Sequence, residues 1–486
     1  MRVLLVATWG LPLLWRRARY RVPQFPGELC GRSTEIRPGE WVESYSSTAT
    51  IRKALEGHEV KAVVVGMESV VDKCQRPSEA GDDKQRVDRE VCERNEELFG
   101  KVQSVEEIRK AAEEVLRRYA ELFLGEAEVL VAPAVGWYRS YRFVGSLDTA
   151  RFFLLDEFYT LLNRHRPDVV VLDVTHGVNY LPLVASQALK TAAKALYLKQ
   201  VSDKQPECLI SLNSDPVAED GAEAVLHVAE MTKFEEVTYN DLFTDLTFSQ
   251  PAEVIPWRFL PDASSPAHRD PLKQQTAQLR NRLRATARKI ADLAKALNLG
   301  LLLYFVTKYD ETDMEEAVKE VSQLAEEVKR QALSAEVYRG GKIAVVRRVA
   351  AAPEVALLKM AAEVIYDVGT RLAECKWEDG FYRLSCLGQR AKELKVGMVA
   401  ETLFGNEVDD LKNKLSNKEP HEPTLICELI NKKDDTETEC KPCAINRRIL
   451  IAHASLNKTT TEVVKRQGEL YVRLRKECLG EIERNL

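Results

Sequence analysis

Residues 2–7 read RVLLVA and residues 169–174 read VVVLDV, two apolar runs that decide the fold of the first half of the chain. Apolar runs without polar alternation are typical of strands that are buried on both faces of a parallel sheet. Two more runs have this character, AVVVG at residues 62–66 and EVLVA at residues 128–132. A shorter run, ALYL at residues 195–198, is interpreted as a fifth strand.

Stretches in which apolar residues recur at helical spacing separate these runs. They lie at residues 47–57, 105–124 and 147–162. Strands that alternate with helices form right-handed βαβ units. The sequence therefore predicts an α/β, Rossmann-like domain with a mainly parallel sheet over residues 1–220.

The composition is that of a globular protein. The chain has 486 residues, with 45% hydrophobic and 30% charged side chains, and its length predicts about three domains. A mainly disordered chain, a collagen-like chain and a polytopic membrane protein are excluded. Lys and Arg number 70 against 75 Asp and Glu, a net charge of −5. Any nucleic acid must therefore be held by a local basic patch.

The first 15 residues resemble a signal peptide only in part. One Arg precedes an apolar stretch, but Gly10 and Pro12 interrupt it, and arginines follow at positions 16, 17 and 19. No apolar run approaches the roughly 18 residues that a membrane-spanning helix needs. We therefore expect a cytoplasmic protein without a membrane partner.

Residues 221–300 are interpreted as a connector followed by a long helix. Prolines recur at positions 251, 256, 261, 266 and 271, and a leucine stripe at helical spacing follows over residues 272–297. The basic side chains of this helix lie largely off the stripe. They form a solvated face in the simplest interpretation, and a helix-pairing or RNA-facing role is the alternative.

Residues 301–486 are predicted to form an all-α domain, with strand-like residues 342–346 after its first helix. The expected helices are 314–333, 354–374, 387–404, 444–455 and 460–482. Residues 406–442 are polar and mixed in charge, and are interpreted as an insertion loop.

Ten cysteines are scattered along the chain, which argues against a disulfide framework in a protein of this length. Three of them, Cys427, Cys440 and Cys443, follow His421. Their spacing lacks the two ligand pairs of a full zinc signature, so no metal site is predicted. A disulfide from Cys427 to Cys440 or to Cys443 is the other interpretation.

Glycines, hydroxyl side chains and aromatic residues follow three of the predicted strands. The segments are TWGLP at residues 8–12, PAVGW at 133–137 and THGVNY at 175–180. Ligands of open parallel sheets bind at the carboxyl ends of the strands, so these segments are candidate ligand loops. None of them is a dinucleotide fingerprint or a nucleotide-phosphate loop.

The ligand loops suit an anionic ligand. Gly10 and Gly177 allow backbone N–H groups to approach anionic oxygens closely. Ser46, Ser47 and Thr48 stand where a helix is predicted to begin, so their hydroxyls and the free N–H groups of the helix point the same way.

Aromatic side chains in or near the loops are able to stack on a base. Trp9, Trp137 and Tyr180 are the candidates for stacking on adenine, and packing in the core is the alternative for each. His176 either contacts the ligand or is a turn histidine that forms a hydrogen bond with the backbone.

Arg448 and His453 stand five positions apart in an apolar helical context. On a helix their side chains point about 140° apart, which suits a helix beside a cleft and excludes a shared metal site. When a ribose 2′-hydroxyl attacks its own phosphate, a histidine can transfer the proton and an arginine can stabilise the phosphorane oxygens. Because one His serves poorly as both acid and base, two copies at a two-fold axis are expected. A half-buried His and a surface Arg without function are the alternative.

Three segments in this order resemble the CARF–HEPN accessory ribonucleases of type III CRISPR systems, of the Csx-one type. The resemblance rests on Thr8-Trp9-Gly10, on the D-x-T-H-G-x-N segment at residues 173–179, and on Arg448 with His453. Residues 220–340 carry no matching motif.

The resemblance implies a CARF domain that dimerises and binds a cyclic oligoadenylate, most often the tetra-adenylate. It also implies a HEPN domain that dimerises, in which Arg448 and His453 form a ribonuclease site that needs no metal or other cofactor. Members of the family often have Asn after the Arg; here Ile449 stands there and Asn446 precedes the Arg, so no third, orienting residue is assigned. The ligand-binding residues that the resemblance implies are Thr8, Trp9, Gly10, Thr175, His176, Gly177 and Asn179, to which the helix-start position adds Ser46, Ser47 and Thr48.

The sequence therefore predicts an endoribonuclease of antiviral defence that a cyclic oligoadenylate activates and that cuts single-stranded RNA. The expected products have 2′,3′-cyclic phosphate and 5′-hydroxyl ends, and the expected partners are RNA, the cyclic ligand and one or more further copies of the chain. One alternative is a ligand-sensing, DNA-binding transcription regulator with a helix-turn-helix within residues 272–333. The other is a dimerisation module whose catalytic pair is inactive.

Overall fold

An eight-stranded sheet organises the first half of the protein, in the strand order β5-β2-β12-β11-β10-β1-β6-β7. Strands β11, β10, β1, β6 and β7 are mutually parallel, which confirms the predicted α/β, Rossmann-like domain with a mainly parallel sheet. They span Cys208–Ser214, Val169–Asp173, Arg2–Thr8, Glu59–Met67 and Glu128–Ala132. The computed structural model describes residues 1–21, 28–29, 32–33, 41–72, 74, 81–199, 206–235, 237–243, 255–260, 266–394, 398–430 and 440–485.

Helices cover both faces of this sheet because the side chains of its strands alternate between them. Leu4 and Val6 of β1 belong to the same core as α4 and α5, whereas Val3 and Leu5 pack with α1, and Ala7 packs with α3. Both faces are therefore apolar, which explains the runs without polar alternation. The helices are α1 (Ser47–Ala54), α3 (Val105–Leu124), α4 (Leu147–His165) and α5 (Leu181–Lys199).

Two sequence predictions for the sheet are wrong. Residues 195–198 lie in α5 and not in a strand, because a short apolar run does not distinguish a buried helix from a buried strand. Residues 222–233, expected within a connector, form β12 (Ala222–Lys233), which pairs with β11 and β2 (Ala18–Arg21). Much of β12 is exposed and polar, so its sequence lacks an apolar signal. The sheet thus continues beyond the expected boundary at residue 220.

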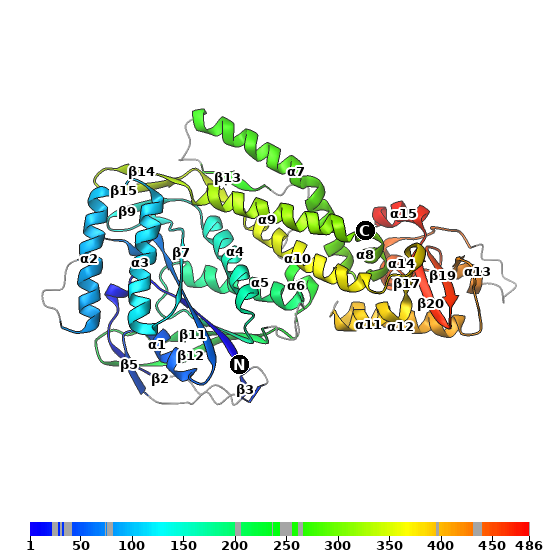
Figure 1. The fold of residues 1–486 in the computed structure, drawn as a ribbon, viewed down its shortest axis with the longest axis horizontal. Helices are drawn as coiled ribbons and strands as arrows, with labels where there is room; N and C mark the ends of the chain where they lie inside the picture. Colours follow the sequence, from blue (N-terminus) through cyan, green and yellow to red (C-terminus); the bar gives the residue numbers. More distant parts are fainter. Residues whose placement is uncertain are drawn as a thin grey trace.

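Long helices connect the two lobes of the molecule, as Figure 1 shows. The predicted helices 272–297, 314–333 and 354–374 are confirmed. They are α7 (Pro266–Asn298), α9 (Glu311–Leu333) and α10 (Pro353–Ala373), with the short α8 (Leu302–Lys308) between the first two.

A β-ribbon between α9 and α10 returns to the first lobe. Its strand β15 (Ile343–Arg347), predicted at 342–346, pairs in parallel with β9 (Tyr141–Val144). Strand β9 pairs in turn with β8 (Gly136–Trp137), directly after β7. The chain between α9 and α10 is thereby attached to the carboxyl edge of the sheet. The flanking strands are β14 (Ala335–Arg339) and β16 (Val349–Ala351), the latter paired with β13 (Trp257–Phe259).

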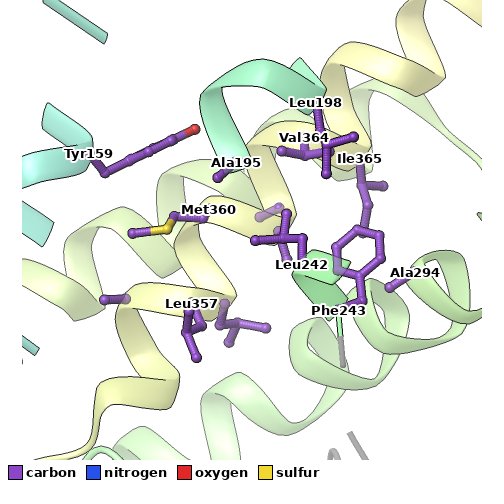
Figure 2. Packing of buried hydrophobic residues seen from close by; sticks show 14 of the residues in the cluster. Tyr159, Ala195, Leu198, Leu242, Phe243, Ala294, Leu357, Met360, Val364 and Ile365 are labelled. Carbon is purple, nitrogen blue, oxygen red and sulfur yellow. The ribbon is translucent and has the colours of Figure 1, made fainter. Parts of the chain in front are cut away.

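Helix α10 packs against helices of the first lobe through a continuous apolar core. Figure 2 shows Met360 and Val364 of α10 near Ala195 of α5 and Leu242 of α6 (Tyr239–Phe243). All four residues are fully or almost fully buried. One cluster extends from β1 to the last helix, so the lobes share a core and are not linked by a flexible tether.

The second lobe is mostly helical but not all-α, which corrects the prediction for residues 301–486. An antiparallel sheet of order β17-β20-β19-β18 lies within it. The expected helix 460–482 is wrong: β19 (Thr461–Arg466) and β20 (Glu469–Leu474) form a hairpin. Gln467 and Gly468 have left-handed φ values of 50° and 83°, as a tight hairpin turn requires.

Helix boundaries in this lobe also differ from the prediction. The stretch 387–404 forms two helices, α11 (Leu384–Glu393) and α12 (Met398–Leu415), and α12 replaces the first part of the expected loop 406–442. The stretch 444–455 forms only the shorter α14 (Arg447–Ala452). The remaining elements are β17 (Tyr382–Arg383), β18 (Thr424–Leu425), α13 (Ile426–Ile430) and α15 (Leu479–Asn485).

Disulfides are present, contrary to the prediction from scattered cysteines. Within the part of the chain that the structure describes, every cysteine is disulfide-bonded, and no group of three His, Cys, Asp or Glu side chains is arranged to hold a metal ion. No helix there is both long and apolar enough to cross a membrane. Cys208 is among the bonded cysteines, and four of the pairs are Cys74–Cys92, Cys375–Cys386, Cys427–Cys440 and Cys443–Cys478.

Candidate functional site

The carboxyl ends of β1 and β10 form the topological switch point of the sheet. The chain proceeds from β1 to β6 and β7 on one side, and then to β10 and β11 on the other. Ligands of open α/β sheets bind at such a point. The two loops that follow β1 and β10 are joined here, because the Gly10 N–H donates a hydrogen bond to the His176 carbonyl oxygen at 2.7 Å.

Asp173, at the end of β10, is the centre of the hydrogen bonds that shape this edge. Its Oδ2 accepts hydrogen bonds from the hydroxyls of Ser47 and Thr48, each at 2.7 Å, and its Oδ1 accepts from the Thr175 N–H at 3.0 Å. The buried carboxylate thus ties the start of α1 to the loop after β10. Asp173 begins the D-x-T-H-G-x-N segment, but sequence reasoning assigned it no role.

Five of the predicted ligand residues are completely buried. Trp9 donates from Nε1 to the Thr48 hydroxyl at 3.1 Å and packs edge-to-face on Trp15. The Thr8 hydroxyl lies 3.4 Å from the Asp173 carbonyl oxygen, and Ser46 caps α1. In this structure these side chains hold the loops in place and do not reach the surface. The five are Thr8, Trp9, Ser46, Ser47 and Thr48.

His176 is partly buried in the loop after β10. Its ring stacks on Trp15, with the centroids 3.9 Å apart, and its Nε2 accepts the Ser47 N–H at 3.2 Å. Burial lowers the pKa of His176 from 6.5 to about 4, and the nearby Asp173 carboxylate opposes this shift. The ring is therefore neutral at pH 7, as an acceptor nitrogen requires.

Gly10 and Gly177 are required by packing within the chain. A Cβ at Gly10 would collide with the Val178 side chain, and a Cβ at Gly177 would collide with Pro182 and the Thr8 hydroxyl. The tip of the loop lies outside this tight packing. Asn179 is exposed there, with a left-handed φ of 55°.

A cavity of about 160 Å³ opens beside these loops, lined by Gly10 and Val178 and also by Tyr138 and Arg139. Arg139 is exposed, and sequence reasoning did not single it out. The neighbouring Trp137 is 67% exposed. The guanidinium of Arg142 and the ammonium of Lys342 lie 4.7 and 5.5 Å from its ring centroid. This edge therefore offers cations and an aromatic surface, which suit a ligand with phosphates and bases.

A second group of candidate residues lies on and after α14 in the other lobe. Asn446 caps this helix by accepting the Ile449 N–H at 3.0 Å. Arg448 is exposed, and it forms no ion pair with any residue that the structure describes. His453 ends the helix, with 45% of its side chain exposed. Both groups are accessible to a substrate.

Glu407 orients His453. Its Oε1 lies 3.0 Å from Nδ1 of His453, and its side chain is 21% exposed. The contact fixes the ring and leaves Nε2 without a hydrogen bond to any described residue. An imidazole held in this way can transfer a proton at Nε2, and an accessible guanidinium on the same helix can stabilise a phosphorane. No sequence signal indicated Glu407, which lies in the region interpreted as a loop.

Two family models match the chain. The CARF domain of the CRISPR system endoribonuclease Csx1 matches residues 4–216. The HEPN domain of the same endoribonuclease matches residues 398–476. The first match contains the edge at β1 and β10, and the second contains Glu407, Arg448 and His453. A search of curated proteins finds no match.

Proposed function

From the premise that the chain belongs to the CARF–HEPN, Csx1-type family of CRISPR-associated endoribonucleases, we propose a specific reaction and activator. The protein cuts single-stranded RNA without a metal ion when a cyclic oligoadenylate, the tetra-adenylate in the first place, binds the CARF edge. The observation that carries the catalytic part is the accessible His453, held by Glu407, with the exposed Arg448 on the helix that His453 ends.

The cleavage uses the RNA's own nucleophile. The ribose 2′-hydroxyl attacks the adjacent phosphate, a histidine removes its proton, and the 5′-oxygen leaves after protonation. The products therefore have 2′,3′-cyclic phosphate and 5′-hydroxyl ends. Arg448 neutralises the negative charge that develops on the phosphorane. A homodimer supplies a second His453, so that one ring acts as base and the other as acid.

Ligand binding shifts the protein toward its cutting state only to the extent that the ligand prefers that state. Arg139, which lines the cavity, and the exposed Trp137 and Asn179 of the adjoining loops supply the contacts for phosphates and adenines. The buried hydroxyls that donate to Asp173 fix the conformation of the loops at this edge. The shared core along α10 offers a mechanical connection to the HEPN lobe.

The proposal is tested by incubating the purified protein with end-labelled single-stranded RNA in excess EDTA, with and without cyclic oligoadenylates of several ring sizes. We expect cleavage in EDTA, strongly stimulated by one ring size, and fragments that end in cyclic phosphates. Cleavage that EDTA stops, or that no cyclic oligoadenylate stimulates, contradicts the proposal.

Asn179→Gly is expected to desensitise the protein to its activator. Glycine accepts the left-handed backbone without strain, so the change removes only the side-chain amide. Loss of one hydrogen bond to the ligand raises the half-activating concentration by roughly 5- to 10-fold, as a dose–response curve of RNA cleavage would show. Basal cleavage and the melting temperature stay unchanged.

Arg166→Gly is the matched control for this variant. Arg166 also has a left-handed φ, of 44°, but it follows α4 at the opposite edge of the sheet. It should respond to the activator like the unmodified protein. If basal and activated rates of Asn179→Gly fall together, Asn179 is not part of the sensor.

A further inference from the structure

Helix α7 carries a row of cations on its exposed face. Arg280, Arg284 and Arg288 are four positions apart, so they share one face of the helix, and all three are exposed. Leu283 and Ile290, on the side of the helix that faces the core, are buried. Successive arginines of the row are about 6 Å apart along the helix axis. This distance is comparable to the separation of neighbouring phosphates in a polynucleotide.

Acidic residues of α9 neutralise a different side of α7. Lys289 forms an ion pair with Asp313, and Thr286 donates a 2.5 Å hydrogen bond to Glu320. Among the described residues, Arg280 and Arg284 form no ion pair, and Arg288 interacts electrostatically with Asp292 one turn further on. The cations of the row are therefore available to an external anion.

A groove runs between this face of α7 and strand β13. It encloses about 370 Å³ and is lined by Arg280 and Arg284, by Asn281 and by the partly buried ring of Phe259. On the far side of β13, Arg258 lines a second hollow of about 480 Å³, together with Lys190 and Lys194 and the carboxylates of Asp148 and Glu354. Cations therefore flank β13 on both sides, and an aromatic ring lies beside the arginine row.

We propose that the arginine row of α7, defined as Arg280, Arg284 and Arg288, binds the phosphate backbone of single-stranded RNA. Guanidinium groups bind phosphates with charge-assisted hydrogen bonds. An aromatic ring such as Phe259 stacks on any unpaired base, which favours a single strand over a duplex. The chain as a whole carries a charge of −5, so only a local row of this kind can attract RNA.

The position of the row suits substrate capture, and in this respect the inference rests on the proposed function. Helix α7 leads to α8 beside the second lobe (Figure 1). In α8, the Tyr304 N–H donates to the Ser455 hydroxyl at 3.3 Å, two positions after His453. RNA that lies along the row therefore leads toward the lobe that contains Arg448 and His453.

The test compares the triple variant R280Q/R284Q/R288Q with the matched triple variant R86Q/R117Q/K319Q. The control removes the same charge from exposed cations on α2 (Asp83–Lys101), α3 and α9, each paired with a neighbouring acid in its own helix. The probe is a fluorescent 2′-O-methyl oligouridylate of about 30 nucleotides, longer than the about 4–16 nucleotides of typical single-strand sites. It has no 2′-hydroxyl and stays intact whichever residues catalyse cleavage.

Fluorescence anisotropy at several salt concentrations gives the affinity and its salt dependence. We expect the row variant to bind roughly 10- to 100-fold more weakly than the unmodified protein, and to lose about 2 from the slope of log affinity against log salt. The control should bind within about 2-fold of the unmodified protein, because exposed ion pairs contribute little. Equal affinity and slope in both triple variants overturn the proposal.

Cleavage kinetics and sedimentation separate this proposal from its rivals. The row variant should raise the KM for a long RNA and leave the KM for a hexanucleotide unchanged. If the unmodified protein binds the probe through the row but cuts no RNA, the proposed function is wrong, and the proposal that the row binds RNA is supported. If all three proteins cut RNA with the same KM, the proposal that the row binds RNA is wrong, and the proposed ribonuclease function is retained. A changed oligomeric state without a change in RNA affinity assigns the row to a contact between copies and overturns the proposal.

Discussion

His453→Ala is expected to lower the rate of RNA cleavage by on the order of 10²–10⁴-fold, the usual contribution of a positioned general acid or base. The ring is half exposed, so its removal leaves no cavity in the core. The fold and the affinity for the cyclic activator should therefore be unchanged. Single-turnover cleavage of labelled RNA, together with equilibrium binding of the cyclic oligoadenylate, measures both quantities on the same preparation.

A second histidine in the same lobe provides the control for this experiment. His421 is 74% exposed, and its nearest acidic contact is Glu419, 4.0 Å away. His421→Ala should cut RNA at the unmodified rate. Retained cleavage by His453→Ala would refute the catalytic assignment outright.

Because Glu407 contacts His453, we expect the substitutions at this site to lower the rate of RNA cleavage by different amounts. Glu407→Gln keeps the size of the side chain but loses the charge that holds Nδ1, so cleavage should fall by less than in His453→Ala. Arg448→Lys keeps the positive charge but loses the planar fork that matches phosphate oxygens, and it should also be impaired. A chain in which neither substitution slows cleavage would indicate that α14 lies outside the nuclease site.

The central strands of the sheet could be predicted from the sequence because β1, β6, β7 and β10 are apolar on both faces. The strand β12 could not, because much of it is exposed and its pairing with β11 is decided by backbone hydrogen bonds. The second strand of the hairpin, Glu469–Leu474, did leave a signal in the sequence, because apolar residues recur at every second position (Leu470, Val472 and Leu474) after the turn at Gln467 and Gly468. The charged residues between its apolar residues produced a pattern that was interpreted as an amphipathic helix.

The candidate site was predictable in position but not in detail. Residues after parallel strands must lie at one edge of the sheet, so the loops at 8–10 and 175–179 were found from the sequence alone. Whether a hydroxyl faces a ligand or a buried carboxylate depends on tertiary packing, which turns Ser47 and Thr48 toward Asp173. Glu407 could not be predicted for the same reason. It lies on a different helix from His453, so no fixed number of residues separates the two in the sequence.

Arg347→Met is expected to destabilise the first lobe by about 3–5 kcal/mol, the cost of leaving a buried charge without its partner. Arg347 lies on β15, and its guanidinium Nη2 is 2.5 Å from Oε1 of Glu68, with both side chains almost completely buried. Arg109 also reaches this oxygen, at 3.2 Å, and the Ala134 N–H donates to the other one. Because Arg109 remains, we expect the lower end of the range. The measurement is urea denaturation followed by tryptophan fluorescence.

The adjacent residue, Arg348, lies between β15 and β16 and provides a matched control. Arg348 is partly exposed and pairs with Glu336 at the surface, so Arg348→Met should cost only about 0–1 kcal/mol. The double variant Glu68→Gln with Arg347→Met should recover much of the lost stability, because it leaves no unpaired buried carboxylate. Nε of Arg347 has no hydrogen-bond partner among the described atoms, so the native pair is itself imperfectly satisfied. If Arg347→Met costs no more than Arg348→Met, the buried pair does not hold the β15 ribbon to the ligand edge, and contacts such as its strand pairing with β9 do so instead.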